Sequence, residues 1–254
     1  MRHYLYNDEV EVRFENKGHK YFVTDPLEGL DNDNGIPSST GVLSVIDKPG
    51  LLWWVANSAS DYVREHLKPG VALDEIDIEV FAKQVRLSRF QKSDRAKAIG
   101  SLGHRMVERD CLGEEQDEPT NPEVLSSWHS WLEFKEASGL EVIDTEFLCY
   151  SRQYSYVGTC DIEAIAYGKA VILDLKTSKG IYPDMHLQTA SYEAARREEY
   201  PEKKYAATGI VRVPKDGGEL EVAWRRPVEV AQDFEAFKAA RRLWKWKKEN
   251  DTRR

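Results

Sequence analysis

The chain has 254 residues, of which 41% are hydrophobic and 31% are charged, with a formal net charge of −8. A chain of this size can bury a good core as one large or two small domains, and its composition is that of a globular protein in water. No apolar run approaches the ~20 residues of a membrane span, and the start MRHYLYNDEVEVRF lacks the apolar core of a signal peptide. We therefore expect no membrane partner, and the cytoplasm as the location.

The cysteines exclude several kinds of site. There are three, Cys111, Cys149 and Cys160, and none belongs to a C-x-x-C pair. An odd count without such a pair argues against a disulfide framework and a structural zinc site. An iron–sulfur cluster needs four thiolates, so no iron–sulfur cluster is expected either.

The N-terminal region is predicted to form strands and then a helix. Residues 1–24 alternate in the manner of strands around a hairpin at 16–18, and an acidic loop follows them. Apolar residues at helical spacing predict an amphipathic helix over 51–67, with Trp53 and Trp54 at its start. These two side chains could stack on unpaired bases, but packing in the core is the favoured interpretation.

The next segment is predicted to be helical throughout. Residues 74–111 show helical spacing with a break around Leu87–Lys92, and the second part carries Gly100 and Gly103 on one stripe. Glycine inside a helix costs up to ~1 kcal/mol relative to alanine, so we expect these two to allow close packing. A further helix is predicted over 122–138, ended by a C-cap glycine.

Two strand-like runs, CDIEAIA and AVILDLKT, flank a tight turn signal at 167–169. If Tyr167 and Gly168 form a two-residue turn, positions that sum to 335 pair, and Asp161 lies opposite Asp174. Sliding the turn by one residue pairs Asp161 with Lys176 on the same face, whereas a three-residue loop without a bulge would separate them. Either of the first two registers brings two carboxylates and an ammonium together.

Converging carboxylates repel each other, so a sheet surface needs a cation to hold them together. A hard divalent ion, Mg²⁺ or Mn²⁺, is the natural partner of carboxylate oxygens and water. A lysine beside such an ion can orient a water or stabilise a phosphate, which suits metal-assisted phosphodiester hydrolysis. The alternative is a surface hairpin with an Asp–Lys salt bridge, and a D-x-K triplet alone does not distinguish the two.

Four motifs in register carry more information than the triplet: Gly100-x-x-x-His104, Gly158-x-x-Asp161, Asp174-Leu-Lys176 and Gln188-x-x-x-Tyr192. In this order and spacing they resemble the PD-(D/E)XK nuclease superfamily, and within it the RecB-like branch, which includes phage-encoded exonucleases. The resemblance covers residues 97–192 well and the N-terminal third loosely. Cys160 stands before Asp161 where the superfamily name has proline, and members of this branch often lack that proline.

The resemblance implies a role for each motif residue. Asp161 and Asp174 are expected to be catalytic and to hold the metal, with His104 and the main-chain carbonyl of Leu175 as further ligands. Lys176 is expected to position the attacking water and to stabilise developing charge.

A second set of residues is expected around this centre. The resemblance implies that Gln188 and Tyr192 contact DNA and steady the metal site, whereas the residues alone also allow an exposed helix face. Three glutamates stay open as contributors: Glu108, one helical turn after His104; Glu146, on a strand predicted over 140–151; and Glu163, two residues after Asp161 on the same predicted face.

The predicted fold is α/β, a central mixed sheet of four or five strands flanked by helices, as in the restriction-endonuclease-like nuclease core. We expect one nuclease domain over 1–254. It would comprise an N-terminal hairpin-and-helix wing (1–92), a catalytic core (93–200), and a C-terminal hairpin with a basic helix (201–254).

The resemblance implies a DNA exonuclease that uses Mg²⁺ or Mn²⁺ and leaves 5′-phosphates. It would act on linear single- or double-stranded DNA in phage-type recombination, replication or repair. The setting would be a bacterial or phage-infected host cell, and a partner protein could come from recombination or replication. The charge of −8 is awkward for binding phosphates, but residues 238–254 carry a local net charge of +6. The alternatives are a catalytically silent nucleic-acid-binding or regulatory protein on the same fold, and an interaction module whose acidic surface mimics DNA. Strand polarity, RNA activity and oligomeric state stay open.

Overall fold

The computed structural model describes residues 2–15, 18, 20–30, 35–69 and 76–251. Its internal contacts divide the chain into two compact units. One comprises Met1–Ile46 and Gly103–Arg254, and we call it the core unit; the other is Asp47–Leu102, and we call it the helical hairpin. The N-terminal strands therefore group with Gly103–Arg254, and not with the helices of the expected wing.

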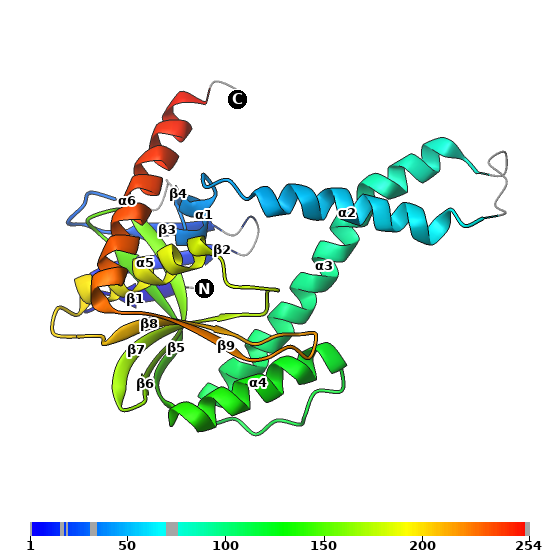
Figure 1. Cartoon of the computed structure of the whole chain (residues 1–254). Coiled ribbons are helices and arrows are strands. Elements are labelled where there is room, and N and C mark those ends of the chain that lie inside the picture. Colours follow the sequence, from blue (N-terminus) through cyan, green and yellow to red (C-terminus); the bar gives the residue numbers. More distant parts are fainter. Residues whose placement is uncertain (1, 16–17, 19, 31–34, 70–75, 252–254) are drawn as a thin grey trace. The chain divides into compact units, whose positions relative to one another are not determined.

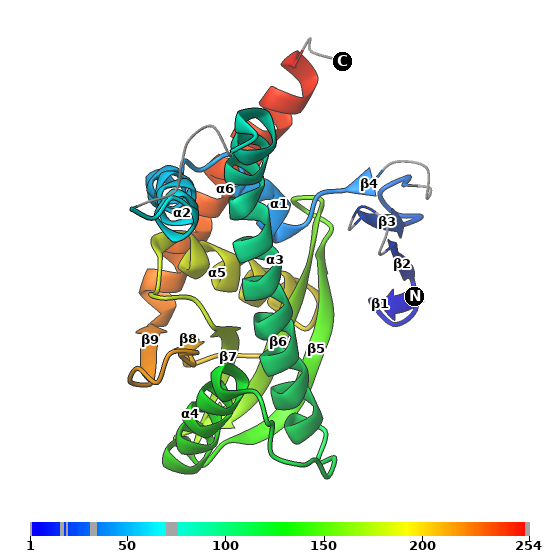
Figure 2. The same ribbon diagram turned by 90° about the vertical axis from the view of Figure 1, so that its right-hand side faces the viewer.

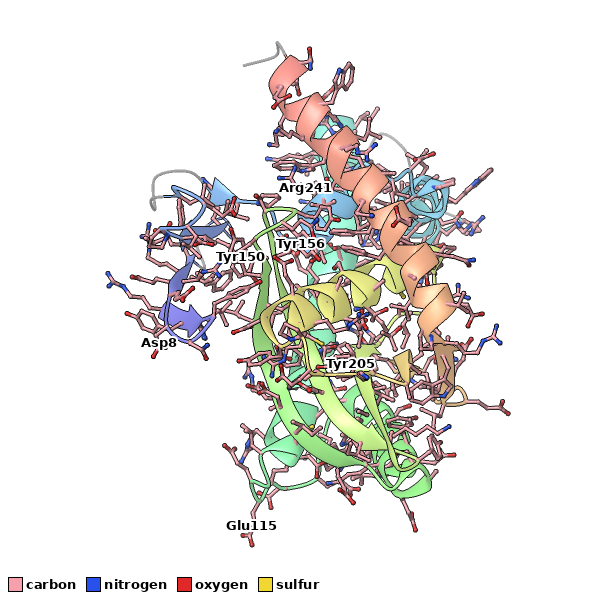
Figure 3. All side chains as sticks on the ribbon, turned by 90° about the vertical axis from the view of Figure 1, so that its left-hand side faces the viewer. Asp8, Glu115, Tyr150, Tyr156, Tyr205 and Arg241 are labelled. Carbon is pink, nitrogen blue, oxygen red and sulfur yellow. The ribbon has the colours of Figure 1, made fainter. Side chains whose placement is uncertain are left out.

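The core unit holds two sheets. The first is antiparallel, in the order β1 (Arg2–Leu5), β2 (Val10–Glu15), β3 (Lys20–Thr24) and β4 (Gly35–Ile36). The pairing of Glu15 with Lys20 confirms the predicted N-terminal hairpin, although residues 16, 17 and 19 of its turn lie outside the described residues. Apolar side chains of this sheet pack against Leu148, Tyr150 and Val157 of the second sheet; Tyr150 is labelled in Figure 3.

The second sheet has five strands in chain order: β5 (Glu141–Ser151), β6 (Tyr156–Ala166), β7 (Lys169–Lys176), β8 (Ala207–Arg212) and β9 (Glu221–Arg225). Neighbours are antiparallel except for the parallel pair β7–β8. Parallel strands need a crossover connection, which contains helix α5 (Pro183–Glu199) (Figure 1). The predicted mixed sheet flanked by helices is confirmed.

The β6–β7 hairpin has the predicted register. Ala166 pairs with Lys169 and Ile162 with Leu173, so paired positions sum to 335. The pairing ends there, so the predicted pair of Asp161 with Asp174 is not formed. Tyr167 and Gly168 have φ of 50° and 70°, as the two central residues of a type I′ turn require. The slipped turn and the three-residue loop are therefore wrong.

The five-stranded sheet has a core on each face. One face packs against helices α1 (Ser39–Leu43), α5 and α6 (Pro227–Asn250), and the other against α4 (Pro122–Ser138) and the end of α3 (Ile78–Cys111) (Figure 2). On α6, Arg241 donates to the carbonyl oxygens of Tyr154 and Ser155, which ties this helix to the β5–β6 turn (Figure 3). None of the described helices combines the length and apolar character needed to cross a membrane.

Two sequence-based expectations for the helices are wrong. Helix α3 runs through Leu87–Lys92 without a break, because this stretch has no proline or glycine to interrupt it. Trp53 on α2 (Pro49–His66) is 73% exposed, so the favoured packing role does not apply to it; Trp54 is half-buried. The helix over 122–138 is confirmed, and Gly139 ends it at φ 57°.

A close contact between α5 and β6 depends on one glycine. The ring of Tyr192 lies against the backbone of β6 at Gly158, where an added Cβ would be 2.6 Å from Tyr192 Cδ1 and 3.1 Å from Ser39 Oγ. Only glycine allows α5 to approach β6 this closely. Tyr192 is 3% exposed, so the interpretation of the Gln188–Tyr192 pair as an exposed helix face is wrong for the tyrosine.

We predict that Gly158→Ala lowers the free energy of unfolding by about 1–3 kcal/mol, because the new methyl group overpacks the contact with Tyr192. Urea denaturation measures this. The matched control is Gly180→Ala, since a Cβ at Gly180 would meet nothing within 4 Å and should change stability by less than about 0.5 kcal/mol. Equal stability of the two variants would contradict the packing role of Gly158.

Candidate functional site

Three side chains from three elements of the core unit converge on one point. They are His104 of α3, Glu146 of β5 and Asp161 of β6, and one candidate ligand atom from each lies within 4.8 Å of the other two. His104 Nδ1 is 3.8 Å from Asp161 Oδ2. All three side chains are half-buried. An imidazole nitrogen with two carboxylates is a donor set that divalent metals accept.

Asp161 stands where the ladder between β6 and β7 ends. The last backbone pair is Ile162–Leu173, and in a continued ladder the Leu175 N–H would bond to the carbonyl of residue 160. The Leu175 N–H donates instead to Asp161 Oδ2 at 2.6 Å. The carboxylate thus replaces a backbone acceptor, and this bond holds it against β7.

The path of β6 changes at the same residue. Cys160 packs in the core beneath α5 and α6, whereas Ile162 packs in the core beneath α3 and α4. In a regular strand, residues two apart share a face, so the alternation is broken at Asp161. For this reason Glu163 does not share the face of Asp161, contrary to the sequence-based expectation.

Glu146 occupies a strained position. Its φ is +48°, in the left-handed region that non-glycine residues rarely adopt, and the register of β5 against β6 shifts nearby, between Val142 and Asp144. Burial raises the pKa of Glu146 to about 8, and the carboxylates of Asp161, Glu108 and Asp174 add to this rise while Lys176 opposes it. Strain and like-charge crowding at one residue are features that persist at functional sites.

Asp174 and Lys176 form an ion pair next to Asp161. Asp174 is 1% exposed, and its Oδ2 is in contact with Lys176 Nζ. Burial raises the pKa of Asp174 to about 7; Lys176 opposes the rise and Asp161 adds to it. Burial alone would lower the pKa of Lys176, but the charges of Asp174 and Asp161 outweigh it and raise the pKa. Apart from the lysine contact, neither Asp174 oxygen finds a hydrogen-bond partner among the described residues.

The Gln188–Tyr192 pair supports this region from α5. Gln188 Nε2 donates to the Tyr192 hydroxyl at 2.5 Å. Burial raises the pKa of Tyr192 well above its usual value, and the carboxylates of Asp174 and Asp161 add to the rise, opposed by the Gln188 hydrogen bond. The tyrosine hydroxyl is therefore a neutral group that lies near both aspartates.

The structure thus brings most of the predicted site residues together. One region is surrounded by His104, Asp161, Asp174 and Lys176. Glu146, whose part in the site the sequence did not decide, belongs to the same cluster. Glu108 acts on that cluster through its charge. Leu175 contributes its N–H to Asp161, and the ligand role of its carbonyl stays a prediction.

Glu163 belongs to a separate cluster of ions. It is 2% exposed, and its carboxylate accepts hydrogen bonds from Arg196, Lys203 and Tyr205; Tyr205 is labelled in Figure 3. Arg196 also bonds Asp144 at 2.8 Å. Burial would raise the pKa of Glu163, but the hydrogen bonds from Lys203 and Tyr205 and the charge of Arg196 outweigh it and lower the pKa. These hydrogen bonds engage both oxygens, so the Glu163 carboxylate is not free to bind a metal.

Sequence reasoning missed the residues of this second cluster. Arg196 lies one helical turn after Tyr192 on the same side of α5, and this spacing is the signal that could have pointed to it. Lys203 follows the helix in a turn, where no periodic pattern marks it.

Comparisons with known proteins add no relative. No protein-family model matches the chain, and a search of curated proteins found no significant match.

We predict that Glu163→Gln lowers the free energy of unfolding by about 3 kcal/mol, because removing one partner of a buried ion pair leaves its cations uncompensated. Chemical denaturation measures this loss. Asp161→Asn is the contrast, since its half-buried carboxylate pairs with no lysine or arginine among the described residues, and the amide oxygen of asparagine can still accept the Leu175 N–H. This variant should change the free energy of unfolding by less than about 1 kcal/mol. A larger loss of stability in Asp161→Asn than in Glu163→Gln would contradict the structural role of Glu163.

Proposed function

We propose that this protein is a nuclease that depends on a divalent metal and hydrolyses phosphodiester bonds of DNA. The observation that carries the proposal is the convergence of His104, Glu146 and Asp161 beside the Asp174–Lys176 pair. A nitrogen ligand, several carboxylates and one half-buried ammonium are groups that suit such a reaction.

The residues of the cluster fit Mg²⁺ or Mn²⁺. Glu146 and Asp174 have pKa values raised to about 8 and about 7, first by burial and then by neighbouring carboxylates. A hard dication would compensate this crowding. Apart from the Lys176 contact, the two Asp174 oxygens lack hydrogen-bond partners within the described part of the chain. The ion would be held by His104, Glu146, Asp161 and Asp174. The resemblance implies the Leu175 carbonyl as a further ligand.

Each side chain then has a task in hydrolysis. A bound Mg²⁺ or Mn²⁺ would polarise the phosphoryl oxygen and lower the pKa of the attacking water. Lys176, held charged by Asp174 and Asp161, would orient that water and offset the negative charge that grows on the phosphate. The Leu175 N–H keeps Asp161 in place. Tyr192 is too buried to touch DNA through its ring, so it would steady the site. Gln188 is half-buried, and the resemblance implies that it contacts the DNA.

The choice of an exonuclease rests on the resemblance of the four motifs to the RecB-like branch of the PD-(D/E)XK nucleases. A mixed five-stranded sheet with helices on both faces is compatible with that core. The products would then carry 5′-phosphates, and the setting would be recombination, replication or repair of the phage type.

The test is digestion of linear DNA labelled at its 5′ or 3′ end, beside a closed circle, with Mg²⁺ or Mn²⁺ and with a chelator as control. We expect the linear DNA to be degraded and the closed circle to stay intact. The end whose label is released first gives the direction in which the exonuclease works. Cutting of the circle would indicate an endonuclease. Binding without degradation in any lane would establish a catalytically silent nucleic-acid-binding protein instead.

We predict that Lys176→Ala abolishes turnover even at saturating Mn²⁺, because the ammonium that orients the water is gone while the candidate ligands remain. Single-turnover digestion of labelled DNA measures this. Asp174→Asn is the contrasting variant and should lose tight Mn²⁺ binding as well, since a neutral amide is a weaker ligand for a hard cation. Calorimetry follows the metal. Turnover like that of the wild type in Lys176→Ala would exclude a catalytic lysine, and unchanged Mn²⁺ affinity in Asp174→Asn would place the metal elsewhere.

We also predict that the basic end of α6 contributes to DNA binding. Lys245, Lys247 and Lys248 are exposed there, within the stretch of local charge +6; Arg253 and Arg254 lie outside the described residues. Reversing the three lysine charges should weaken binding and flatten the salt dependence, because each lost phosphate contact lowers the slope by ~0.7 on single strands and ~0.9 on duplex. Salt titrations that superimpose for variant and wild type would leave these lysines as a solvated tail.

A further inference from the structure

The helical hairpin carries the strongest local positive charge outside the α6 end. Residues 83–97 of α3 contain six Lys or Arg and one acidic residue, Asp94, a net charge of +5 in a chain whose total is −8. Fifteen helical residues extend over about 20 Å, which is enough to lie along several phosphates of a nucleic acid.

The charges divide between two sides of α3. The side that packs against α2 is held by internal contacts: Phe81 meets Tyr62 with ring centroids 5.9 Å apart, the Ser88 hydroxyl donates to the Ser58 carbonyl, and Lys92 pairs with Asp61 at 2.9 Å. Lys92 is thereby part of the packing between the two helices.

The other side is a row of free cations. Lys83, Arg86 and Lys97 lie at i, i+3 and i+14, together with Phe90 at i+7, so they share one helix face. All four are exposed, and the three cations form no ion pair within the part of the chain that the structure describes. Arg89 flanks them and stacks its guanidinium over the Phe90 ring at 4.5 Å. We call Lys83, Arg86, Arg89, Phe90 and Lys97 the basic face of α3.

We propose that the basic face of α3 binds the phosphate backbone of the nucleic acid on which the chain acts, an inference that rests on the proposed function. Unpaired exposed cations lower the stability of a fold by mutual repulsion unless a polyanion meets them. Phe90 is half exposed, and the Arg89 guanidinium lies over its ring. Together these two planar groups offer a surface on which a base can stack.

An anionic membrane would also attract cations, but a helix that lies on a membrane needs a broad apolar face beside its basic one. Between residues 83 and 97 the exposed large apolar side chains are only Leu87 and Phe90, at 37% and 50%. The surface therefore favours a nucleic acid over a lipid bilayer.

The test is the triple variant Lys83→Glu, Arg86→Glu, Lys97→Glu in the full chain. The matched control is Lys20→Glu, Lys169→Glu, Lys204→Glu, which changes the net charge equally at three exposed lysines of the core unit. Fluorescence anisotropy with labelled single-stranded and duplex oligonucleotides, in the presence of a chelator, measures binding without cleavage. Circular dichroism checks that both variants keep their helices.

We expect the α3 variant to bind more weakly and to lose about 2 from the salt slope on single strands and about 3 on duplex, for three lost phosphate contacts, while the control keeps the slope of the wild type. Titrations that superimpose for the α3 variant and the wild type would overturn the inference, and so would an equal loss in the control. Binding of the wild type to phosphatidylserine vesicles but not to oligonucleotides would replace it with a membrane surface.

A separate assay distinguishes failure of this inference from failure of the proposed function. Hydrolysis of the small diester bis(p-nitrophenyl) phosphate with Mn²⁺ reports on the metal centre without a long substrate. Hydrolysis by the wild type and the α3 variant, with unchanged oligonucleotide binding, would overturn the basic face alone. No hydrolysis of DNA or of the small diester would overturn the nuclease, while the salt titrations would still decide whether α3 binds nucleic acid.

Discussion

The hydrogen bond from the Leu175 N–H to the Asp161 carboxylate organises the centre of this protein. It replaces the next rung of the β6–β7 ladder with a side chain, so the two strands separate just where the acidic residues lie. The break in the alternation of β6 follows from it, with Cys160 and Ile162 on different cores. As a result Asp161 meets His104, while Glu163, two residues on, enters a different environment.

The two groups of acids differ in how their charge is compensated. Glu163 has Arg196, Lys203 and Tyr205 around one carboxylate, and its pKa is lowered despite burial. The second group consists of Glu146, Asp161 and Asp174, and Lys176 is its only close permanent cation among the described residues. The pKa values of Glu146 and Asp174 are raised, first by burial. The carboxylates of the second group crowd one another without enough cations to offset their charge, which makes this group the candidate for metal binding. The positive φ of Glu146 adds strain at the same place.

Charge is also unevenly distributed along the chain. Although the net charge of the chain is −8, two segments are basic: residues 83–97 and the end of α6. They lie in different compact units. A nuclease needs cations where phosphates lie and carboxylates where a metal lies. A negative total is therefore no argument against a nucleic-acid substrate when the cations are concentrated on particular helices.

The sequence by itself determined the local features of the fold. The tight turn at Tyr167–Gly168 could be predicted because a type I′ turn needs two residues with positive φ, and the register of the hairpin follows from it by counting. The N-terminal hairpin, the helix capped by Gly139, and the grouping of His104 with Asp161 were predicted in the same way, from periodicity or from motif resemblance. Only the tertiary structure decided which acids belong to the candidate metal site and which belong to the ion cluster of Glu163. Alternation along a strand places Glu163 with Asp161, but the side-chain hydrogen bond at Leu175 breaks that alternation, and no local pattern encodes it. Likewise, the exposure of Trp53 depends on which surfaces meet in space, and spacing along the chain does not specify this.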